Sequence, residues 1–391
     1  MDKEAAKAAG LYNVIGSDLD DAYIAELKKQ IVNPDVIKEM GKTMTVVYTP
    51  LHGTGNIPAR RVLKEIGFEN VYVVPEQELP DGNFPTCPYP NPEIKEAMAL
   101  GMDYAKRNNA DLLLATDPDC DRVGIAVKDK NGEYQLLTGN QTGMLLFDYI
   151  CSQRTKHGKM PADPVMVKTI VSMDMAEQIA KNYGVRVINV LTGFKFIGEQ
   201  IKFFEQNNSY NFVMGMEESY GCLVGTYARD KDAPVAVMCL CEAAAYCKSQ
   251  GITLWDHMLD LYKKYGYYKE GLYTITLKGV TGAEKIRRIM SSLRSESITQ
   301  IDTLKVLKVR DYEKNTITDL ATGVVTESGL PQSNVLYYDL EDGAWACVRP
   351  SGTEPKIKLY YGIKGTSRED ADAKLESLQA ALVEKLNKLA E

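Results

Sequence analysis

Short apolar runs alternate with amphipathic segments along the first two thirds of the chain. The apolar runs are typical of buried strands, and the segments between them carry the three-to-four-residue periodicity of helices. Strands that alternate with helices favour parallel pairing, with helices covering the sheet. The strands are predicted at 44–49, 71–75, 111–115, 165–171, 185–191 and 211–215, and the helices at 57–67, 93–108, 175–184, 194–206, 234–249 and 255–266.

The pattern changes near Gly271. Several β-rich segments separated by turn residues follow one another, from GLYTITLKG to IKLYYGI, and an amphipathic helix is predicted over 367–390. The sequence therefore predicts an α/β protein in four parts: an N-terminal linker with a helix (1–40), two α/β domains with parallel or mixed sheets (41–135 and 136–268), and a smaller α+β domain (269–391).

Polar clusters follow four of the predicted strands. They are TPLHGTGN after VVY, TDPDCDR after LLLA, TGFKF after VINVL, and MEESYG after NFVMG. Ligands of open α/β sheets bind at the carboxyl ends of the strands. We therefore expect one cleft to receive all four clusters.

The cluster TDPDCDR contains three acids at alternate positions, Asp117, Asp119 and Asp121. On an extended backbone such residues project to one side, and a hard divalent cation, most often Mg²⁺, would relieve their repulsion. An EF-hand loop is excluded because Arg122 and Lys128 stand where it needs Gly and Glu. A solvated acidic loop stays open as the alternative.

A second cluster, RPSGTEPK at 349–356, lies between two predicted strands near the C-terminus. Its arginine offers a planar fork to phosphate oxygens, its hydroxyls donate hydrogen bonds, and its glycine lets backbone N–H groups approach an anion. The segment is a candidate phosphate cradle, and a charged surface turn is the alternative.

Charge and composition exclude other classes of function. The chain has 53 acidic and 46 basic residues and a net charge of −7, which offers no general attraction to nucleic acid or anionic lipid. The apolar runs are too short to span a bilayer. The first ten residues, MDKEAAKAAG, contain no apolar h-region, so we expect a cytoplasmic protein without nucleic-acid or membrane partners. In that compartment the eight cysteines, which form no C-x-x-C pair, are expected to be reduced core thiols.

Five motifs together resemble the α-D-phosphohexomutases, the phosphoglucomutase and phosphomannomutase family. They are TPLHGTG, DPDCDR, TGFK, EESYG with YARDKD after it, and RPSGTEPKIKLYYGI, and they occur in the family's order from about Lys42 onward. The resemblance implies two α/β domains of the phosphohexomutase type followed by a C-terminal domain that is similar to the TATA-box-binding fold.

The resemblance also implies roles for individual residues. Asp117, Asp119 and Asp121 would be the Mg²⁺ ligands, Arg122 would lie beside the reacting phosphoryl group, and Lys231 would act as an acid/base or charge-stabilising group, although ARDKDAP also reads as a charged helix entry. The implied substrate contacts are Thr192 and Gly193, the hydroxyl-binding pair Glu217 and Ser219, and the phosphate-binding set Arg349, Ser351, Gly352, Thr353 and Lys358.

The reaction implied is the interconversion of glucose 1-phosphate and glucose 6-phosphate through glucose 1,6-bisphosphate and an active-site phosphoserine. The family carries this serine in a T-A-S-H-N-P-like loop of its first domain, and no Ser-His dipeptide occurs in this chain. We therefore expect a fragment that partners with the missing N-terminal domain of the same polypeptide and is inactive alone. Phosphomannomutase, phosphopentomutase and a non-catalytic sugar-phosphate binding protein are the alternatives.

Overall fold

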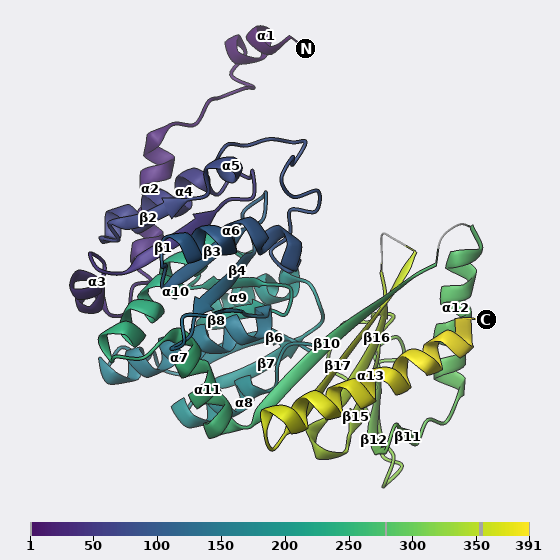
Figure 1. Cartoon of the computed structure of the whole chain (residues 1–391). Helices are drawn as coiled ribbons and strands as arrows, with labels where there is room; N and C mark the ends of the chain where they lie inside the picture. Colours follow the sequence, from purple (N-terminus) through teal and green to yellow (C-terminus); the bar gives the residue numbers. More distant parts are fainter. Residues whose placement is uncertain (1, 278–279, 352–354, 391) are drawn as a thin grey trace. The chain divides into compact units, whose positions relative to one another are not determined.

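The computed structural model describes residues 2–277, 280–351 and 355–390, which form two compact units (Figure 1). The first unit contains residues 1–162 and 201–257, and the second contains residues 163–200 and 258–391. Each unit is therefore discontinuous in sequence. The prediction of an α/β protein with several sheets is confirmed, whereas the domain boundaries at residues 40, 135 and 268 stay predictions.

A five-stranded sheet organises the first unit, in the order β2-β1-β3-β4-β5. Parallel pairing joins β1 to β2 and to β3, while β4 and β5 are added antiparallel. Met98 and Ala105 of α6 are buried against Val47 and Leu113 of the sheet, so one helix face closes this core. The bounds are β1 Thr45–Thr49, β2 Asn70–Val73, β3 Leu112–Thr116, β4 Val123–Lys128, β5 Tyr134–Leu136, α4 Asn56–Ile66, α5 Pro75–Glu78 and α6 Lys95–Arg107.

A nearly all-apolar helix, α10 (Ala233–Ser249), runs through the rest of the first unit. It contacts α3 (Pro34–Met40), α4 and α7 (Gly139–Lys156), which explains why residues all around it are buried. The antiparallel hairpin of β8 (Asn211–Glu217) and β9 (Gly221–Val224) leads into it. Two further N-terminal helices are α1 (Lys3–Ala8), which buries no residue, and α2 (Ser17–Lys28).

The second unit combines a parallel strand pair with a large antiparallel sheet. Strands β6 (Pro164–Thr169) and β7 (Arg186–Val190) pair in parallel on either side of α8 (Met175–Tyr183) in the chain. The large sheet has the order β10-β17-β16-β15-β12-β13-β14, with β11 paired to β12. Its strands are β10 Tyr267–Thr276, β11 Gln300–Ile301, β12 Leu304–Asp311, β13 Thr316–Asp319, β14 Val325–Glu327, β15 Leu336–Leu340, β16 Trp345–Pro350 and β17 Lys356–Gly365.

Two helices cover one face of this large sheet, α12 (Val280–Ser295) and α13 (Arg368–Ala390) (Figure 1). Ile289, Met290, Leu378 and Leu382 of these helices share a buried cluster with the strands. The remaining helices are α9 (Phe194–Asn207) and α11 (Leu254–Tyr265), each of which is shared by the two units. Among the described residues, none of the helices is long and apolar enough to cross a bilayer.

A buried carboxyl group joins the N-terminal segment to α10. Glu242 is fully buried, and its Oε1 accepts hydrogen bonds from the backbone N–H groups of Val32 and Asn33 and from the Tyr149 hydroxyl. Its second oxygen has no hydrogen-bond partner among the described residues. Burial raises the pKa of Glu242 above its ordinary value, because a charged carboxylate loses its hydration there.

This environment predicts a pH-dependent contribution of Glu242 to stability. A carboxyl group whose pKa is raised on folding stabilises the fold fully below its ordinary pKa of 4.5 and loses this contribution as the pH rises through the folded pKa. Glu242→Gln keeps an accepting oxygen but cannot ionise. The melting temperature of this variant, relative to the wild type, should therefore rise by at least about 2 °C between pH 5 and pH 8.

Differential scanning calorimetry at several pH values measures this difference. Glu205→Gln, at an exposed ion pair with Arg229, is the matched surface control and should give a difference that does not change with pH. A constant difference for Glu242→Gln as well would show that the carboxyl group stays ionised in the fold.

Candidate functional site

The three aspartates lie in the turn that connects the antiparallel strands β3 and β4. One carboxylate oxygen of each lies within 4.8 Å of the others, so Asp117, Asp119 and Asp121 do converge. The reason expected from the sequence was wrong, because the segment is a turn and not an extended strand. The Cys120 N–H donates to the Asp117 carbonyl at 3.0 Å, and Cys120 has φ 62°. The tight turn therefore gathers the side chains.

Asp117 is the buried member of the cluster, with 7 % of its surface exposed. Its Oδ1 accepts hydrogen bonds from the N–H groups of Asp121 and Arg122 at 3.0 and 2.9 Å. Burial, together with the charges of Asp121 and Asp119, raises the pKa of Asp117 to about 7. The ionised form of Asp117 is thus unfavourable in this turn unless a positive charge compensates it.

The cluster fits a divalent cation. Asp121 Oδ1 is buried and has no hydrogen-bond partner among the described residues, although a carboxylate oxygen in such a place normally accepts one. Three carboxylates within one coordination sphere are the oxygen ligands that Mg²⁺ prefers. Asp117, Asp119 and Asp121 are therefore the residues that would hold the ion.

The hairpin between β8 and β9 lies next to this turn. The N–H of Val123 donates to the Tyr220 carbonyl at 3.0 Å, and Arg122 forms a backbone bridge with Gly221. Glu217, at the end of β8, is 7 % exposed, and Ser219 Oγ donates to its Oε1 at 3.2 Å. The TPLHGTGN cluster contacts the turn as well, because the N–H of Thr54 donates to the Pro118 carbonyl at 2.8 Å. Three of the four clusters predicted to share a cleft are thus neighbours in the first unit.

Lys231 connects the two loops. Its Nζ lies 2.9 Å from Asp121 Oδ2 and 3.8 Å from Glu217 Oε1. Burial lowers the pKa of Lys231, but the hydrogen bond to Asp121 and the charge of Glu217 outweigh that effect and raise it overall. The amine therefore carries its proton at neutral pH. The side chain also packs on Gly221, where an added Cβ would lie 2.5 Å from Lys231 Cδ.

Arg122 is held on the other side of the aspartates. Its Nη1 donates to Glu93 Oε1 at 3.2 Å, and its Nε lies 3.6 Å from Asp117 and 3.7 Å from Asp121. This Nε is buried without a hydrogen-bond partner among the described residues. The guanidinium group is thus fixed beside the cluster with one N–H still able to donate.

Sequence reasoning missed the residues that support this arrangement. Asp232 follows Lys231, and its carboxylate accepts hydrogen bonds from the hydroxyls of Tyr23 and Tyr227. Its N–H donates to the Cys222 carbonyl at 2.9 Å, which ties the lysine segment to β9. Asp232 and Tyr227 belong to the quoted motif YARDKD, whereas nothing in the sequence around Tyr23 points to this contact.

The other predicted residues belong to the second unit. Thr192 and Gly193 follow β7, and Gly193 has φ 117°, a conformation that favours glycine. Arg349 and Lys358 are register partners on β16 and β17, so two cations lie side by side at the loop that joins these strands. Ser351 begins this loop, and Gly352 and Thr353 lie outside the described residues.

Comparison with known proteins identifies the class of this chain. Sequence models of the phosphoglucomutase/phosphomannomutase family match its alpha/beta/alpha domain II at residues 21–132, its alpha/beta/alpha domain III at 138–265 and its C-terminal domain at 298–383. The chain belongs to the phosphoglucomutase/phosphomannomutase family, as the five motifs predicted.

Curated relatives and solved structures agree. A phosphoglucomutase of Staphylococcus saprophyticus is 33% identical over 368 residues, which are 94% of this chain and 65% of the relative, and one of Staphylococcus epidermidis is 37% identical over 82% of this chain and 57% of the relative. The chain thus spans about three fifths of the length of these relatives.

Two structures show the same fold at lower identity. Parafusin, a phosphoglucomutase from Paramecium, aligns with a TM-score of 0.64 at 15% identity, over 95% of this chain and 62% of that one. A family protein from Burkholderia thailandensis aligns with a TM-score of 0.60 at 16% identity, over 95% and 64%.

The geometry of the turn predicts a selective effect on metal binding. Asp119 is the exposed member of the cluster and has no part in the hydrogen bonds that Asp117 makes within the turn, so Asp119→Asn should leave the fold intact. It should weaken Mn²⁺ binding, measured by electron paramagnetic resonance, by about tenfold or more, because losing even a residue that only orients a metal ligand costs about 10–100-fold in affinity.

The matched control is Asp129→Asn. Asp129 also lies in a hairpin turn, between β4 and β5, but its carboxylate accepts hydrogen bonds from the N–H groups of Asn131 and Glu133. Mn²⁺ affinity should not change in this variant. Equal affinity in wild type and Asp119→Asn would remove Asp119 from the ligand set.

Proposed function

We propose that this chain is the metal- and substrate-binding part of a phosphoglucomutase-type phosphohexomutase, which interconverts glucose 1-phosphate and glucose 6-phosphate. The observation that carries the proposal is the contact of Lys231 with both the aspartate turn and Glu217. Because of this contact, the protonated amine of Lys231, the three aspartates, and the pair Glu217 and Ser219 lie within one small region of the first unit.

Each group has a definite part in such a reaction. Glu217 and Ser219 accept and donate hydrogen bonds, so they would orient the hydroxyl groups of the sugar ring. Lys231 holds a proton close to the aspartates and would neutralise charge or protonate an oxygen as the phosphoryl group moves. Arg122, fixed by Glu93, would place its positive charge beside the reacting phosphoryl group. Phosphoryl transfer depends mainly on such positioning and charge neutralisation.

A divalent ion and a phosphate cradle complete the proposal. Mg²⁺ held by Asp117, Asp119 and Asp121 would supply charge neutralisation at the phosphoryl oxygens. Arg349 and Lys358, which are register partners, would bind the phosphate group that is not transferred, together with Ser351 and the cradle residues Gly352 and Thr353. Thr192 and Gly193 would contact the substrate. Glucose 1,6-bisphosphate would be the intermediate, and an active-site phosphoserine the donor.

The preferred sugar is glucose in this proposal, because the curated relatives quoted above are phosphoglucomutases. Mannose and pentose phosphates are the competing substrates. Glu217 and Ser219 recognise hydroxyl groups in all three, so discrimination would depend on their placement against the ring and not on their chemistry.

Substrate binding provides the first test. Isothermal titration of the full chain with glucose 1-phosphate and Mg²⁺ should give saturable binding, and Glu217→Gln should weaken it by about tenfold or more, because a charged acceptor is lost from a buried site. Glu205→Gln removes a carboxylate of the same type from the surface of the same unit and should bind as the wild type does. Unchanged binding by Glu217→Gln would contradict the assigned role.

Turnover provides the second test. The 391-residue sequence contains no Ser-His dipeptide, so it does not include the phosphoserine loop that is expected of the family. With glucose 1-phosphate, Mg²⁺ and a trace of glucose 1,6-bisphosphate, these 391 residues alone should form glucose 6-phosphate no faster than the background. A coupled dehydrogenase assay measures the product. Turnover clearly above background would show that another group in the chain serves as phosphoryl donor.

A further inference from the structure

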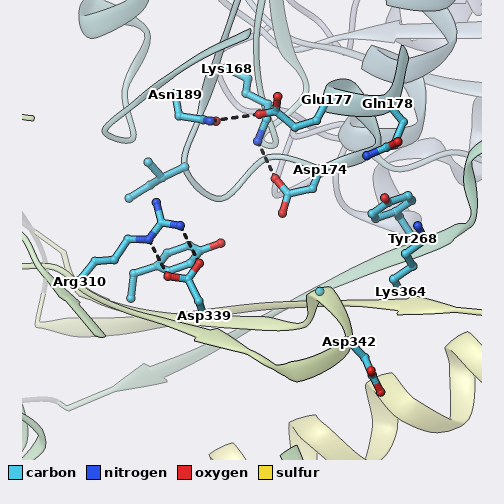
Figure 2. Close-up of a pocket in the computed structure, with 13 residues that line it drawn as sticks. Lys168, Asp174, Glu177, Gln178, Asn189, Tyr268, Arg310, Asp339, Asp342 and Lys364 are labelled. Carbon is cyan, nitrogen blue, oxygen red and sulfur yellow. Dashed lines mark hydrogen bonds and ion pairs between the residues drawn. The ribbon is translucent and has the colours of Figure 1, made fainter. Parts of the chain in front are cut away.

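A polar cavity lies wholly within the second unit. It has a volume of about 500 Å³ and is formed by β6, β7 and α8 on one side and by the large sheet on the other (Figure 2). This volume is typical of pockets that hold small organic ligands. None of the described substrate residues assigned above lines it, so it is a different place from the proposed active site.

A fixed cation forms the floor of the cavity. Lys168 is only 1 % exposed, and its Nζ donates hydrogen bonds to the Ser172 carbonyl at 3.1 Å and to Asp174 Oδ1 at 2.9 Å. A buried lysine with two such partners has little rotational freedom. The side chains of Lys168 and Asp174 are therefore held in place without a ligand.

Next to this lysine, an acceptor group is left unsatisfied. Asn189 is the register partner of Lys168 on β7, and its Nδ2 donates to Glu177 Oε1 at 3.2 Å. Its Oδ1 is buried and accepts no hydrogen bond from any described residue. A buried acceptor without a partner is unfavourable, because it has lost its hydrogen bonds to water. Asn189 is half-buried and lines the cavity, so a rotation of its amide group would present this oxygen to an O–H or N–H group there.

The opposite wall is flat and rigid. Arg310 forms two hydrogen bonds with Asp339 (Figure 2), at 2.8 and 2.6 Å. Its guanidinium carbon lies 5.0 Å from the centre of the Tyr337 ring. Tyr337 in turn stacks on Trp345, with the ring centres 5.5 Å apart. This wall therefore presents a locked, charge-paired guanidinium plane, which can donate hydrogen bonds while its charge is already neutralised.

The charge balance of the lining argues against an anionic ligand. Three cations, on Lys168, Arg310 and Lys364, face four carboxylates, and the sum is −1. Two of the cations are already paired, with Asp174 and Asp339. A phosphate ester would bring up to two further negative charges next to these carboxylates, which is unfavourable. The lining instead offers many donors and acceptors with little net charge.

We propose that this cavity binds an uncharged polyhydroxyl compound, an unphosphorylated mono- or disaccharide. Hydroxyl groups both donate and accept, so they can satisfy Asn189 Oδ1 and also accept from the donors of the opposite wall. The flat Arg310–Asp339 pair and the ring of Tyr268, over which Lys364 lies at 5.1 Å, suit the alternating polar and apolar surface of a sugar ring. The proposal does not rest on the proposed mutase activity.

Isothermal titration of the full chain with glucose, maltose and sucrose tests the proposal, with glucose 1-phosphate as the charged comparison. We expect at least one neutral sugar to bind, and Asn189→Leu to weaken that binding by about fivefold to tenfold, the effect of one lost hydrogen bond. Binding of glucose 1-phosphate should not change in this variant. Neutral-sugar binding should in turn survive Glu217→Gln, which separates this site from the proposed active site.

The matched control is Asn70→Leu. Asn70 also lies on a strand and donates one hydrogen bond from its side-chain amide, to the Lys42 carbonyl at 2.7 Å, but it does not line the cavity. Neutral-sugar binding should not change in this variant. Circular dichroism verifies folding, and if Asn189→Leu does not fold, Lys364→Met on the opposite side of the cavity replaces it with the same expected loss.

Three results would overturn the proposal. One is the absence of binding by every neutral sugar at concentrations up to about 50 mM, a range that detects even weak complexes. Another is neutral-sugar binding that is lost in Glu217→Gln but kept in the cavity variants, which would assign it to the proposed active site. The third is tighter binding of a phosphate ester to the cavity than of its neutral sugar.

Discussion

The repulsion among three carboxylates in one turn is the constraint on which the site depends. Asp117, Asp119 and Asp121 cannot all keep their charges in so small a volume unless positive charge lies beside them. Within the described protein this charge comes from Arg122 in the turn itself and from Lys231, which is more than a hundred residues away in the sequence. The turn, the β8–β9 hairpin and the entry to α10 are therefore linked by charge as well as by packing.

This linkage explains the supporting contacts. Glu93 holds Arg122, the Glu217 loop packs on the turn, and Asp232 is fixed by two tyrosine hydroxyls directly after the lysine. Of these groups, Glu93 and Asp232 have no substrate contact in the proposed function. Each limits the positions that a charged side chain can take, and preorganised charge is what phosphoryl transfer requires. The polar cavity of the second unit differs from this site, because Lys168 and Arg310 already form ion pairs within its lining and the net charge of the lining is small.

The sequence predicted the class of fold and the identity of the clustered residues, and local patterns explain why. Apolar periodicity located most strands and helices, and the three acids of TDPDCDR are visible without any structure. Their convergence was explained wrongly, because the antiparallel pairing of β4 with β3, and hence the turn, depends on a tertiary contact that periodicity does not encode. Tyr23 and the unsatisfied Asn189 could not be predicted for a similar reason, since each matters only through a neighbour that the fold supplies.

The discontinuity of the first unit has a consequence for the order in which the protein forms during synthesis. Its N-terminal segment is held by Glu242, and the residues between 163 and 200 belong to the other unit. A growing chain that has reached residue 162 still lacks the helix that receives Val32 and Asn33. The ribosome must therefore add some eighty further residues before this core can close, which takes about 4–16 s at ordinary rates of translation. The apolar surfaces of the core stay open to solvent or chaperones during that interval.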